Sequence, residues 1–176
     1  MTKKLFSYVD GFARAYPIII ITQAVLNGLL NNDSHSIYLS AILLGTDIFN
    51  HIIKNFLFKP LMKDKMFPVL GMGKRPQSKN CGLFKNGTYS SSYGMPSGHA
   101  QIAWVFSTYW IQKILNNSTI SSIHKGLLVL LLVLLALLIG YSRIYWAKCH
   151  TIQQVIVGSI IGIGFGVLSY KQLEKI

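Results

Sequence analysis

One uncharged stretch constrains the fold of this chain more than any other feature. Residues 126–140 read GLLVLLLVLLALLIG, and Arg143 supplies the next charge. A helix needs about 20 apolar residues to cross the hydrocarbon core of a bilayer. The segment Gly126–Ala147 therefore predicts a transmembrane helix.

The composition agrees with a membrane protein. Apolar residues make up 51% of the 176 residues and charged residues only 12%, against roughly a quarter in soluble domains. The formal net charge is nevertheless +12. A chain this apolar is not expected to bind nucleic acid. The excess positive charge is instead explained by binding to anionic lipid head groups, by binding to a phosphorylated substrate, or by basic residues in cytoplasmic loops.

Four more segments have the length and character of helices. They are Tyr16–Leu30, Ile37–Phe58, Gly98–Leu115 and Thr151–Tyr170. The last carries a glycine every fourth residue, at 158, 162 and 166, which predicts close contact with another helix. We therefore expect an all-α, multi-pass transmembrane bundle of about five helices, forming a single domain over residues 1–176.

Five spans fix the sidedness of the loops. The N-terminus, the long loop Lys59–Ser97 and the short loop Ser142–His150 fall on one side, and the C-terminus falls on the other. A polar loop of this length is usually functional. Cys81 and Cys149 are taken to form no disulfide framework and to say nothing of the redox compartment. No cleavable signal peptide is recognisable.

Three polar clusters lie on the side of the long loop. They are Lys74-Arg75-Pro76, Pro96-Ser97-Gly98-His99 and Ser142-Arg143 with His150 seven residues beyond Arg143. Taken one at a time, these residues have ordinary explanations: the Lys and Arg residues are solvated charges, Ser97 is a helix N-cap, and Arg143 extends from its helix end to the lipid head groups. Together they offer cations and a helix N-terminus for the oxygens of a phosphoryl group. The clusters therefore predict an oxyanion site at one membrane face.

These motifs resemble the type 2 phosphatidic acid phosphatase superfamily. The segments Tyr-Ser-Arg-Ile-Tyr at 141–145 and His-Thr-x-x-Gln-Val at 150–155 are similar to its dolichyldiphosphatase-like branch, and the resemblance covers roughly residues 47–165. It implies a membrane lipid phosphatase that hydrolyses a lipid diphosphate or phosphate, with a polyprenyl or dolichyl diphosphate favoured.

The resemblance also implies roles for residues. His150 would be the nucleophile that forms a phosphohistidine, and His99 the general acid. Phosphate would be bound by Ser97, Gly98, Arg75 and Arg143.

Three departures from the family pattern accompany the resemblance. The usual first-motif lysine position is occupied by Pro68, so Lys54, which we favour, and Lys74 compete for that role. The spacing from Arg143 to His150 is one residue longer than usual. Gln154 stands where the family commonly has Asp, and the dolichyldiphosphatase-like branch also has Gln at this position. The side-chain carbonyl of Gln154 is expected to accept a hydrogen bond from the His150 ring.

No cofactor or metal is expected, because the few acids do not cluster near these motifs. The expected partners are a phosphorylated lipid substrate and membrane lipids, and the oligomeric state is not indicated. The alternatives are a phosphatidate or lipid monophosphate phosphatase, a non-catalytic lipid-phosphate-binding protein, and a channel or transporter. The last lacks the repeated half-helix pattern of transporters. Asp47, inside a predicted span, is either functional or bonded to a neighbouring helix.

The two indicators of orientation disagree. Thirteen of the seventeen Lys and Arg fall on the side of the motifs, and the positive-inside rule would make that side cytoplasmic. The resemblance implies a lumenal or external active site, in the endoplasmic reticulum or another endomembrane. We adopt the orientation that the resemblance implies.

Overall fold

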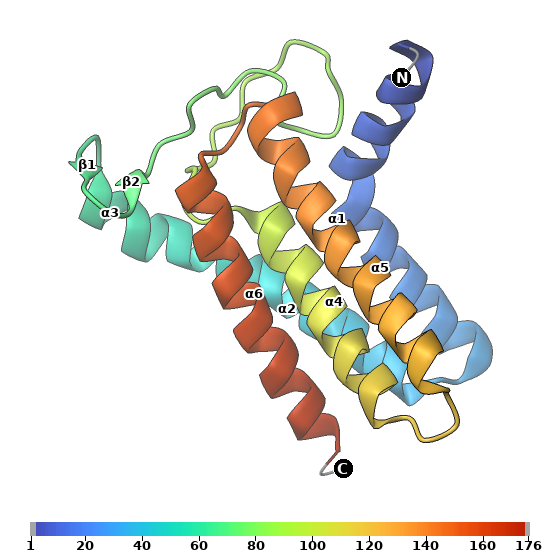
Figure 1. Ribbon diagram of the computed structural model, residues 1–176. Helices are drawn as coiled ribbons and strands as arrows, with labels where there is room; N and C mark the ends of the chain where they lie inside the picture. Colours follow the sequence, from blue (N-terminus) through green and yellow to red (C-terminus); the bar gives the residue numbers. More distant parts are fainter. Residues whose placement is uncertain (1–2, 175–176) are drawn as a thin grey trace.

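Helix α4, Gly98–Asn116, lies at the centre of the bundle and contacts the four other long helices (Figure 1). The computed structural model describes residues 3–174. The surrounding helices are α1 (Lys3–Asn31), α2 (Ser34–Ile53), α5 (Ser122–Tyr141) and α6 (Ile152–Leu173). Within the described residues, these five long helices confirm the predicted all-α bundle.

Two of these helices continue as π-helical turns. α2 runs into η1 (Lys54–Phe58) and then α3 (Lys59–Met62), and α5 runs into η2 (Ser142–Trp146). Among residues 3–174, four continuous helical segments are long and apolar enough to span a membrane: Lys4–Asn31, Ser34–Met62, Ser122–Trp146 and Ile152–Leu173. Their outward sides expose large apolar side chains, as a lipid environment requires. The protein is an integral membrane protein with several spanning helices.

The first helix is longer than the sequence pattern predicted. We expected it to begin at Tyr16, but α1 begins at Lys3 and Pro17 lies inside it. Two charged residues of this extra length, Asp10 and Arg14, are almost completely buried as an ion pair. Hydropathy missed the segment because its charges face protein and not lipid.

The glycine stripe of α6 packs against α4, as predicted. A Cβ at Gly158 would lie 2.5 Å from the carbonyl oxygen of Ser97, and a Cβ at Gly166 would lie 2.9 Å from that of Val105. The close contact therefore needs residues without side chains. It fixes the start of α4 beside the start of α6, where the two histidine motifs lie.

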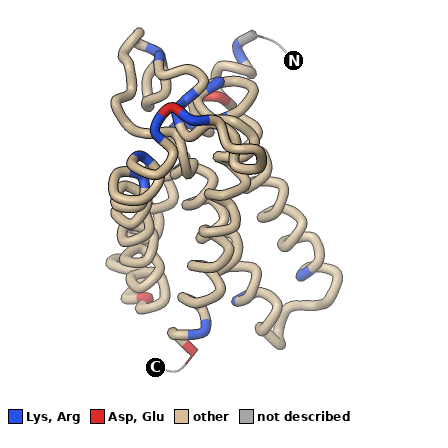
Figure 2. Tube along the Cα trace, turned by 90° about the vertical axis from the view of Figure 1, so that its left-hand side faces the viewer, with Lys and Arg blue, Asp and Glu red and all other residues tan. Residues whose placement is uncertain are grey.

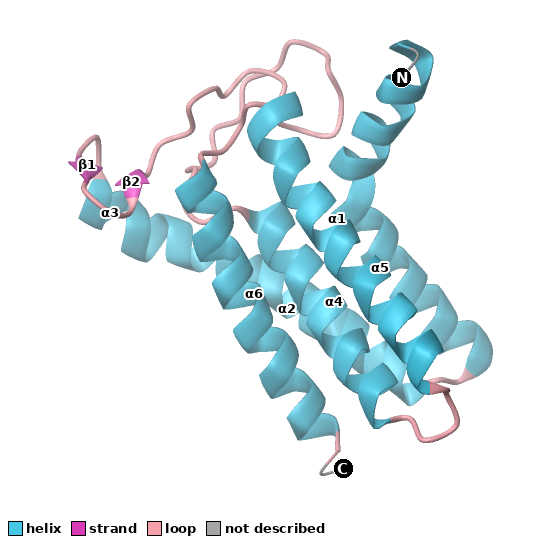
Figure 3. Ribbon diagram, in the orientation of Figure 1, coloured by secondary structure: helices cyan, strands magenta, loops and turns pink. Residues whose placement is uncertain are grey.

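The long connection of residues 63–97 lies at the same end of the bundle as the N-terminus (Figure 3). It includes a small hairpin of β1 (Met66–Phe67) and β2 (Gly71–Met72). Most Lys and Arg residues also gather at this end (Figure 2). The opposite end has only short connections, so the polar chemistry of the molecule is concentrated at one face.

Candidate functional site

A polar cavity of about 170 Å³ lies at the charged end of the bundle. Its walls come from α1, α2 with η1, the long connection, α4, η2 and the segment before α6. It is lined by Pro17, Asp47, Asn50, His51, Lys54, Arg75, Cys81, Ser92, Gly98, His99, Ile102, Arg143 and His150. All three clusters singled out in the sequence therefore reach one cavity, which we call the phosphate pocket, and both histidines line it.

The positive charges of this pocket are not neutralised by carboxylates. Lys54 and Arg143 are buried, Arg75 is partly buried, and none of them takes part in a salt bridge among residues 3–174. Asp47 is the one acidic residue in the lining. A buried charge is costly unless it is paired. The pocket is therefore built to receive an anion.

Two of these cations lie in π-helical turns. Lys54 begins η1 and Arg143 is the second residue of η2. π-helical turns are rare and are frequently found at functional sites, because the wider turn displaces a side chain from the regular helical register. Lys74, the competing first-motif lysine, is exposed and pairs instead with Asp64. Geometry therefore brings Lys54 into the pocket and leaves Lys74 outside it.

The longer spacing between Arg143 and His150 is accommodated by a tight turn and not by a regular helix. The carbonyl of Arg143 accepts hydrogen bonds from the backbone N–H groups of Cys149 and His150, at 3.0 and 3.3 Å. Lys148 has a positive φ of 52° at the bend. The chain therefore folds back, so that Arg143 and His150 line the same pocket despite the extra residue.

Gln154 holds the His150 ring from behind. His150 Nδ1 lies 3.0 Å from Gln154 Oε1, and the amide nitrogen of Gln154 donates to the carbonyls of Met72, Gly73 and Lys74. Those carbonyls fix the amide orientation, since only the NH₂ end can donate to them. The amide oxygen therefore accepts a hydrogen bond from Nδ1–H, which leaves a lone pair on Nε2.

Arg75 contacts that lone pair directly. Its Nη1 lies 2.9 Å from His150 Nε2, while its Nε and Nη2 donate to the backbone carbonyl and the hydroxyl of Ser92 at 2.9 and 2.8 Å. Ser92 thus orients the guanidinium plane. An incoming phosphoryl group has to take the place of Arg75 at Nε2, with Arg75 then free to bind its oxygens.

The electrostatic setting favours a neutral imidazole. Burial, and then the positive charges of Arg75 and Arg143, hold the pKa of His150 well below its usual range. Burial lowers the pKa of Arg75 to about 10. At neutral pH the nucleophile candidate is therefore uncharged beside a protonated guanidinium, the combination that attack on a phosphate dianion needs.

The start of α4 supplies the other side of the pocket. The ring of His99 donates from Nε2 to the backbone carbonyl of Arg14, at 3.1 Å. Ser97 occupies the N-cap position, yet its side chain makes no capping bond and its hydroxyl is buried without a partner. Nε of Arg143 is likewise buried and unpaired. These unused donors are the groups that an oxyanion would satisfy.

The two cysteines correct the sequence interpretation. Cys81 and Cys149 form a disulfide, with their Cα atoms 5.7 Å apart, where we expected no framework. Their separation of 68 residues hid a proximity that only the folding of the long connection creates. The bond ties that connection to the residue directly before His150.

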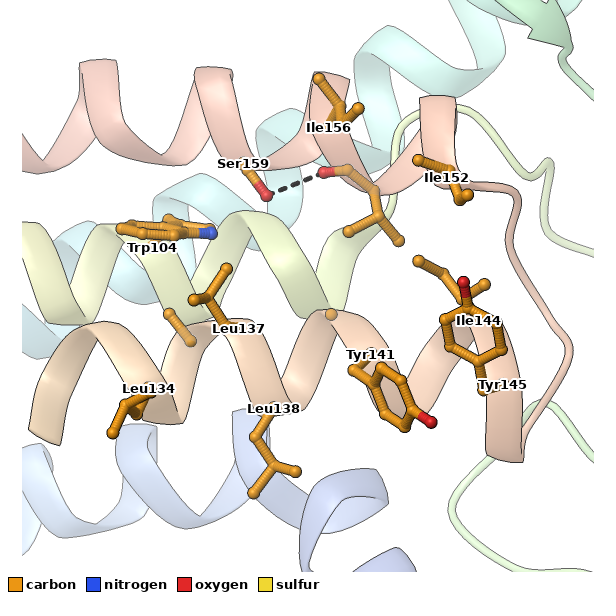
Figure 4. Close-up of a pocket in the computed structure, with 13 residues that line it drawn as sticks. Trp104, Leu134, Leu137, Leu138, Tyr141, Ile144, Tyr145, Ile152, Ile156 and Ser159 are labelled. Atoms are coloured by element: carbon orange, nitrogen blue, oxygen red, sulfur yellow. Dashed lines mark hydrogen bonds between the residues drawn. The ribbon is translucent and has the colours of Figure 1, made fainter.

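A larger cavity lies on the lipid-facing side of η2 and has a different character. It measures about 520 Å³, and its walls come from α4, α5, η2 and α6 (Figure 4). Most of its lining is apolar, and the hydroxyl of Ser159 donates to the carbonyl of Val155 at 2.8 Å. No cationic side chain lines it, so it cannot serve as the phosphate site.

Over residues 3–174, no three His, Cys, Asp or Glu side chains come together as a metal site would require. The pocket is instead furnished with cations and N–H donors, which bind oxyanions directly.

Known proteins are similar to this chain in sequence and in fold. A family model described as the PAP2 superfamily matches residues 35–176. The chain belongs to the PAP2 superfamily. Dolichyldiphosphatase of Saccharomyces cerevisiae is 27% identical over 165 residues, covering 93% of this chain and 62% of its own length. Dolichyldiphosphatase 1 of Homo sapiens is 29% identical over 166 residues, covering 88% of this chain and 61% of its own length. The chain thus spans less than two thirds of these PAP2 relatives.

A solved structure supports the fold of this PAP2 chain. The transmembrane PAP2-type phosphatidylglycerolphosphate phosphatase from Bacillus subtilis aligns with a TM-score of 0.60 and 16% identity. The alignment covers 100% of this chain and 89% of the other. At this identity the likeness concerns the fold, and it extends to α1, which precedes the region matched by the family model.

Sequence reasoning missed three contributors to the pocket. Ser92 orients Arg75, Cys81 offers its carbonyl to Arg143, and Arg14 contacts His99 through its own carbonyl. All three of these contacts use backbone oxygens, which cannot be inferred from residue type. The charged pair Asp10 and Arg14 at i, i+4 was a usable signal for buried ionic structure.

Proposed function

We propose that this protein is a membrane phosphatase that removes phosphate from a phosphorylated lipid. A polyprenyl diphosphate of the dolichyl type is the favoured substrate, because the curated relatives named above are dolichyldiphosphatases. One observation carries the proposal. A neutral His150, held at Nδ1 by Gln154, presents Nε2 to a pocket in which three cations have no carboxylate partner.

The first chemical step would be attack on the terminal phosphorus. The Nε2 lone pair of His150 forms a P–N bond while the bond from phosphorus to the leaving oxygen breaks, giving a phosphohistidine. His99 keeps its Nε2–H on the carbonyl of Arg14, takes up a proton at Nδ1 when the anionic substrate enters the pocket, and gives that proton to the leaving lipid phosphate. Lys54, Arg75 and Arg143, with the N–H groups at the start of α4, stabilise the charge on the equatorial oxygens.

The second step would regenerate the enzyme. His99, now neutral, takes a proton from water, and the hydroxide oxygen attacks phosphorus as the P–N bond breaks. The products are inorganic phosphate and His150 with its Nε2 lone pair restored. Ser97 contributes its unpaired hydroxyl and Gly98 its backbone N–H to the phosphate.

The disulfide supports the orientation in which the pocket faces the lumen. Disulfides persist in oxidising compartments such as the lumen of the endoplasmic reticulum and are rare in the cytosol. Cys81 and Cys149 both lie at the end of the bundle that holds the pocket. We give the disulfide more weight than the positive-inside rule. Several of the Lys and Arg residues on this side line the pocket, where phosphate binding and not membrane orientation explains their presence.

The nucleophile is tested by substitution. Purified His150→Ala should release no phosphate from dolichyl diphosphate in detergent, while melting at the same temperature as the parent protein. His124→Ala, which removes an exposed imidazole far along the chain at the start of α5, should keep full activity. Phosphate release by His150→Ala at the rate of the parent would refute the assigned nucleophile.

The substrate is tested by a panel. Dolichyl diphosphate, dolichyl phosphate and phosphatidate are compared at equal mole fractions in mixed micelles, with and without a chelator. We expect the highest kcat/KM for the diphosphate and no effect of the chelator. A preference for phosphatidate would favour the lipid monophosphate alternative, and binding without turnover of any lipid would favour the non-catalytic one.

Sidedness is tested on the disulfide. In sealed microsomes, Cys81 and Cys149 should resist a membrane-permeant thiol reagent before reduction and take it up after reduction. Labelling of both cysteines before reduction would remove the support for a lumenal pocket.

A further inference from the structure

The buried arginine of the first helix reaches both sides of the phosphate pocket. Arg14 is 5% exposed and pairs with Asp10, which is 2% exposed, through a 3.0 Å contact between Nε and Oδ2. Neither residue belongs to the motifs of the pocket, and α1 precedes the region that the family model matches. Burying an ion pair costs desolvation energy that is recovered only through further hydrogen bonds.

Those further bonds go to the segment that contains Cys81. Arg14 Nη1 donates to the carbonyls of Asn80 and Gly82, at 2.6 and 3.1 Å. The carbonyl between them, that of Cys81, accepts from Arg143 Nη2 at 2.8 Å. Three successive carbonyls are therefore shared between two arginines, and residues 80–82, which we call the Cys81 segment, form a bridge from Arg14 to Arg143.

The same turn of α1 also contacts the other side of the pocket. The backbone carbonyl of Arg14 accepts the hydrogen bond from His99 Nε2. This bond directs the opposite ring nitrogen, Nδ1, away from α1 and fixes the tautomer of the neutral ring. A shift of the Arg14 turn would consequently move the general acid candidate and the Cys81 segment together.

We infer that Arg14 is a positioning residue for phosphoryl transfer, acting through the Cys81 segment on Arg143 and through its own carbonyl on His99. The inference rests on the proposed function, since it assigns Arg14 to the same site. Arg143 needs such support because its Nε is left unpaired for the substrate, and only Nη2 is tied to protein by a hydrogen bond among the described residues.

The experiment compares Arg14→Lys with Lys85→Met. An ammonium keeps the charge beside Asp10 but has no planar fork to bind Asp10 and two carbonyls at once. Lys85 is the matched control, because its Nζ also pairs with Asp10, at 2.7 Å, yet it is half-exposed, and no hydrogen bond joins it to the Cys81 segment among the described residues. In Lys85→Met, Asp10 keeps its buried partner Arg14, so little change in stability is expected.

Two readouts separate positioning from a merely structural role. The kcat on dolichyl diphosphate should fall by roughly 10- to 100-fold in Arg14→Lys with little change in KM. The calorimetric Kd of orthovanadate, which mimics the five-coordinate phosphorus, should rise in parallel. Melting temperature and disulfide content should stay at the parent values, and Lys85→Met should match the parent in every measurement.

A double substitution tests the route through Arg143. If Arg14 acts through it, Arg14→Lys should cost clearly less vanadate affinity in an Arg143→Lys background than in the parent. Unchanged vanadate affinity in Arg14→Lys, or a loss explained wholly by unfolded protein, would overturn the inference. If the parent binds vanadate but hydrolyses no phosphorylated lipid, the proposed function fails while the vanadate comparison still decides the role of Arg14.

If Arg14→Lys does not yield folded protein, a double variant that combines Asp10→Asn with Arg14→Gln removes both charges together. This variant leaves no unpaired buried ion from the Asp10–Arg14 pair. It should show the same rise in vanadate Kd. A parent-like Kd in this folded variant would also overturn the inference.

Discussion

The carboxamide of Gln154 lies between the His150 ring and three successive backbone carbonyls. Its oxygen is 3.0 Å from His150 Nδ1, and its nitrogen donates to residues 72–74 at 2.8 to 3.3 Å. A carboxylate could accept the hydrogen bond from the ring equally well. Its second oxygen, however, would face the three carbonyl oxygens with no hydrogen-bond donor between them. The environment of this position therefore explains why an amide occupies it.

Replacing that amide tests the explanation. Gln154→Glu should lower kcat on a lipid diphosphate by at least about 10-fold, because the loss of three N–H···O contacts leaves the ring support misplaced. The added negative charge stabilises imidazolium, so the acid limb of kcat/KM should also move to higher pH. The neighbouring exposed residue gives the control, and Gln153→Glu should behave as the parent. Identical pH profiles for both variants would make Gln154 irrelevant to His150.

The two candidate lysines are separable by a matched pair of substitutions. Lys54→Met should reduce kcat/KM by about 100-fold, the scale of losing one donor to a developing oxyanion. Lys74→Met removes an exposed lysine that pairs with Asp64 and should change kcat/KM by less than about threefold. Steady-state phosphate release on both variants checks this. The reverse ranking would assign the first-motif role to Lys74.

The contact between α4 and α6 predicts a stability effect. Gly158→Ala should destabilise the protein by about 1–3 kcal/mol, because the new methyl group meets the rigid carbonyl of Ser97. Gly164→Ala places a methyl group where nothing lies within 4 Å and should be neutral or slightly stabilising. Thermal unfolding in detergent, followed by circular dichroism, measures both. Equal melting temperatures for the two variants would contradict the described packing.

The environment of His150 predicts the acid limb of the reaction. Because burial and the adjacent cations lower the pKa of this imidazole, its nucleophilic neutral form persists as the pH falls through the usual imidazole value of 6.5. The acid limb of kcat/KM should therefore lie below that pH. The substrate phosphate also ionises in this pH range, so its own pKa is measured by phosphorus NMR and the pH profile of kcat/KM is corrected for it. A limb at or above pH 6.5 after that correction would conflict with a buried, neutral nucleophile.

Hydropathy and motif spacing predicted the bundle, the side on which the loops gather and the glycine contact of α6. They failed where an interaction depends on the path of the backbone. The start of α1 was missed because Asp10 and Arg14 neutralise each other inside protein. The disulfide and the carbonyl contacts of the Cys81 segment were missed because residues 63–97 have little regular structure from which proximity could be inferred.

Within the pocket, residue types were more informative than spacing. Arginine, lysine and histidine at one face indicated an anion site before any geometry was known. The spacing from Arg143 to His150 and from Lys54 to Arg75 was irregular, and π-helical turns and a tight bend at Lys148 accommodate part of it. Such backbone irregularities have no simple sequence signature.

The bond between Cys81 and Cys149 closes a covalent ring that contains all of α4 and α5. The turn between those helices, at residues 117–121, lies inside this ring and at the far end from the pocket. A protease that cuts that turn would produce two pieces that migrate as one band until a reductant is added. One piece would carry His99 and the other His150, held in register across the cut by a single sulfur–sulfur link and the packing of α4 on α6.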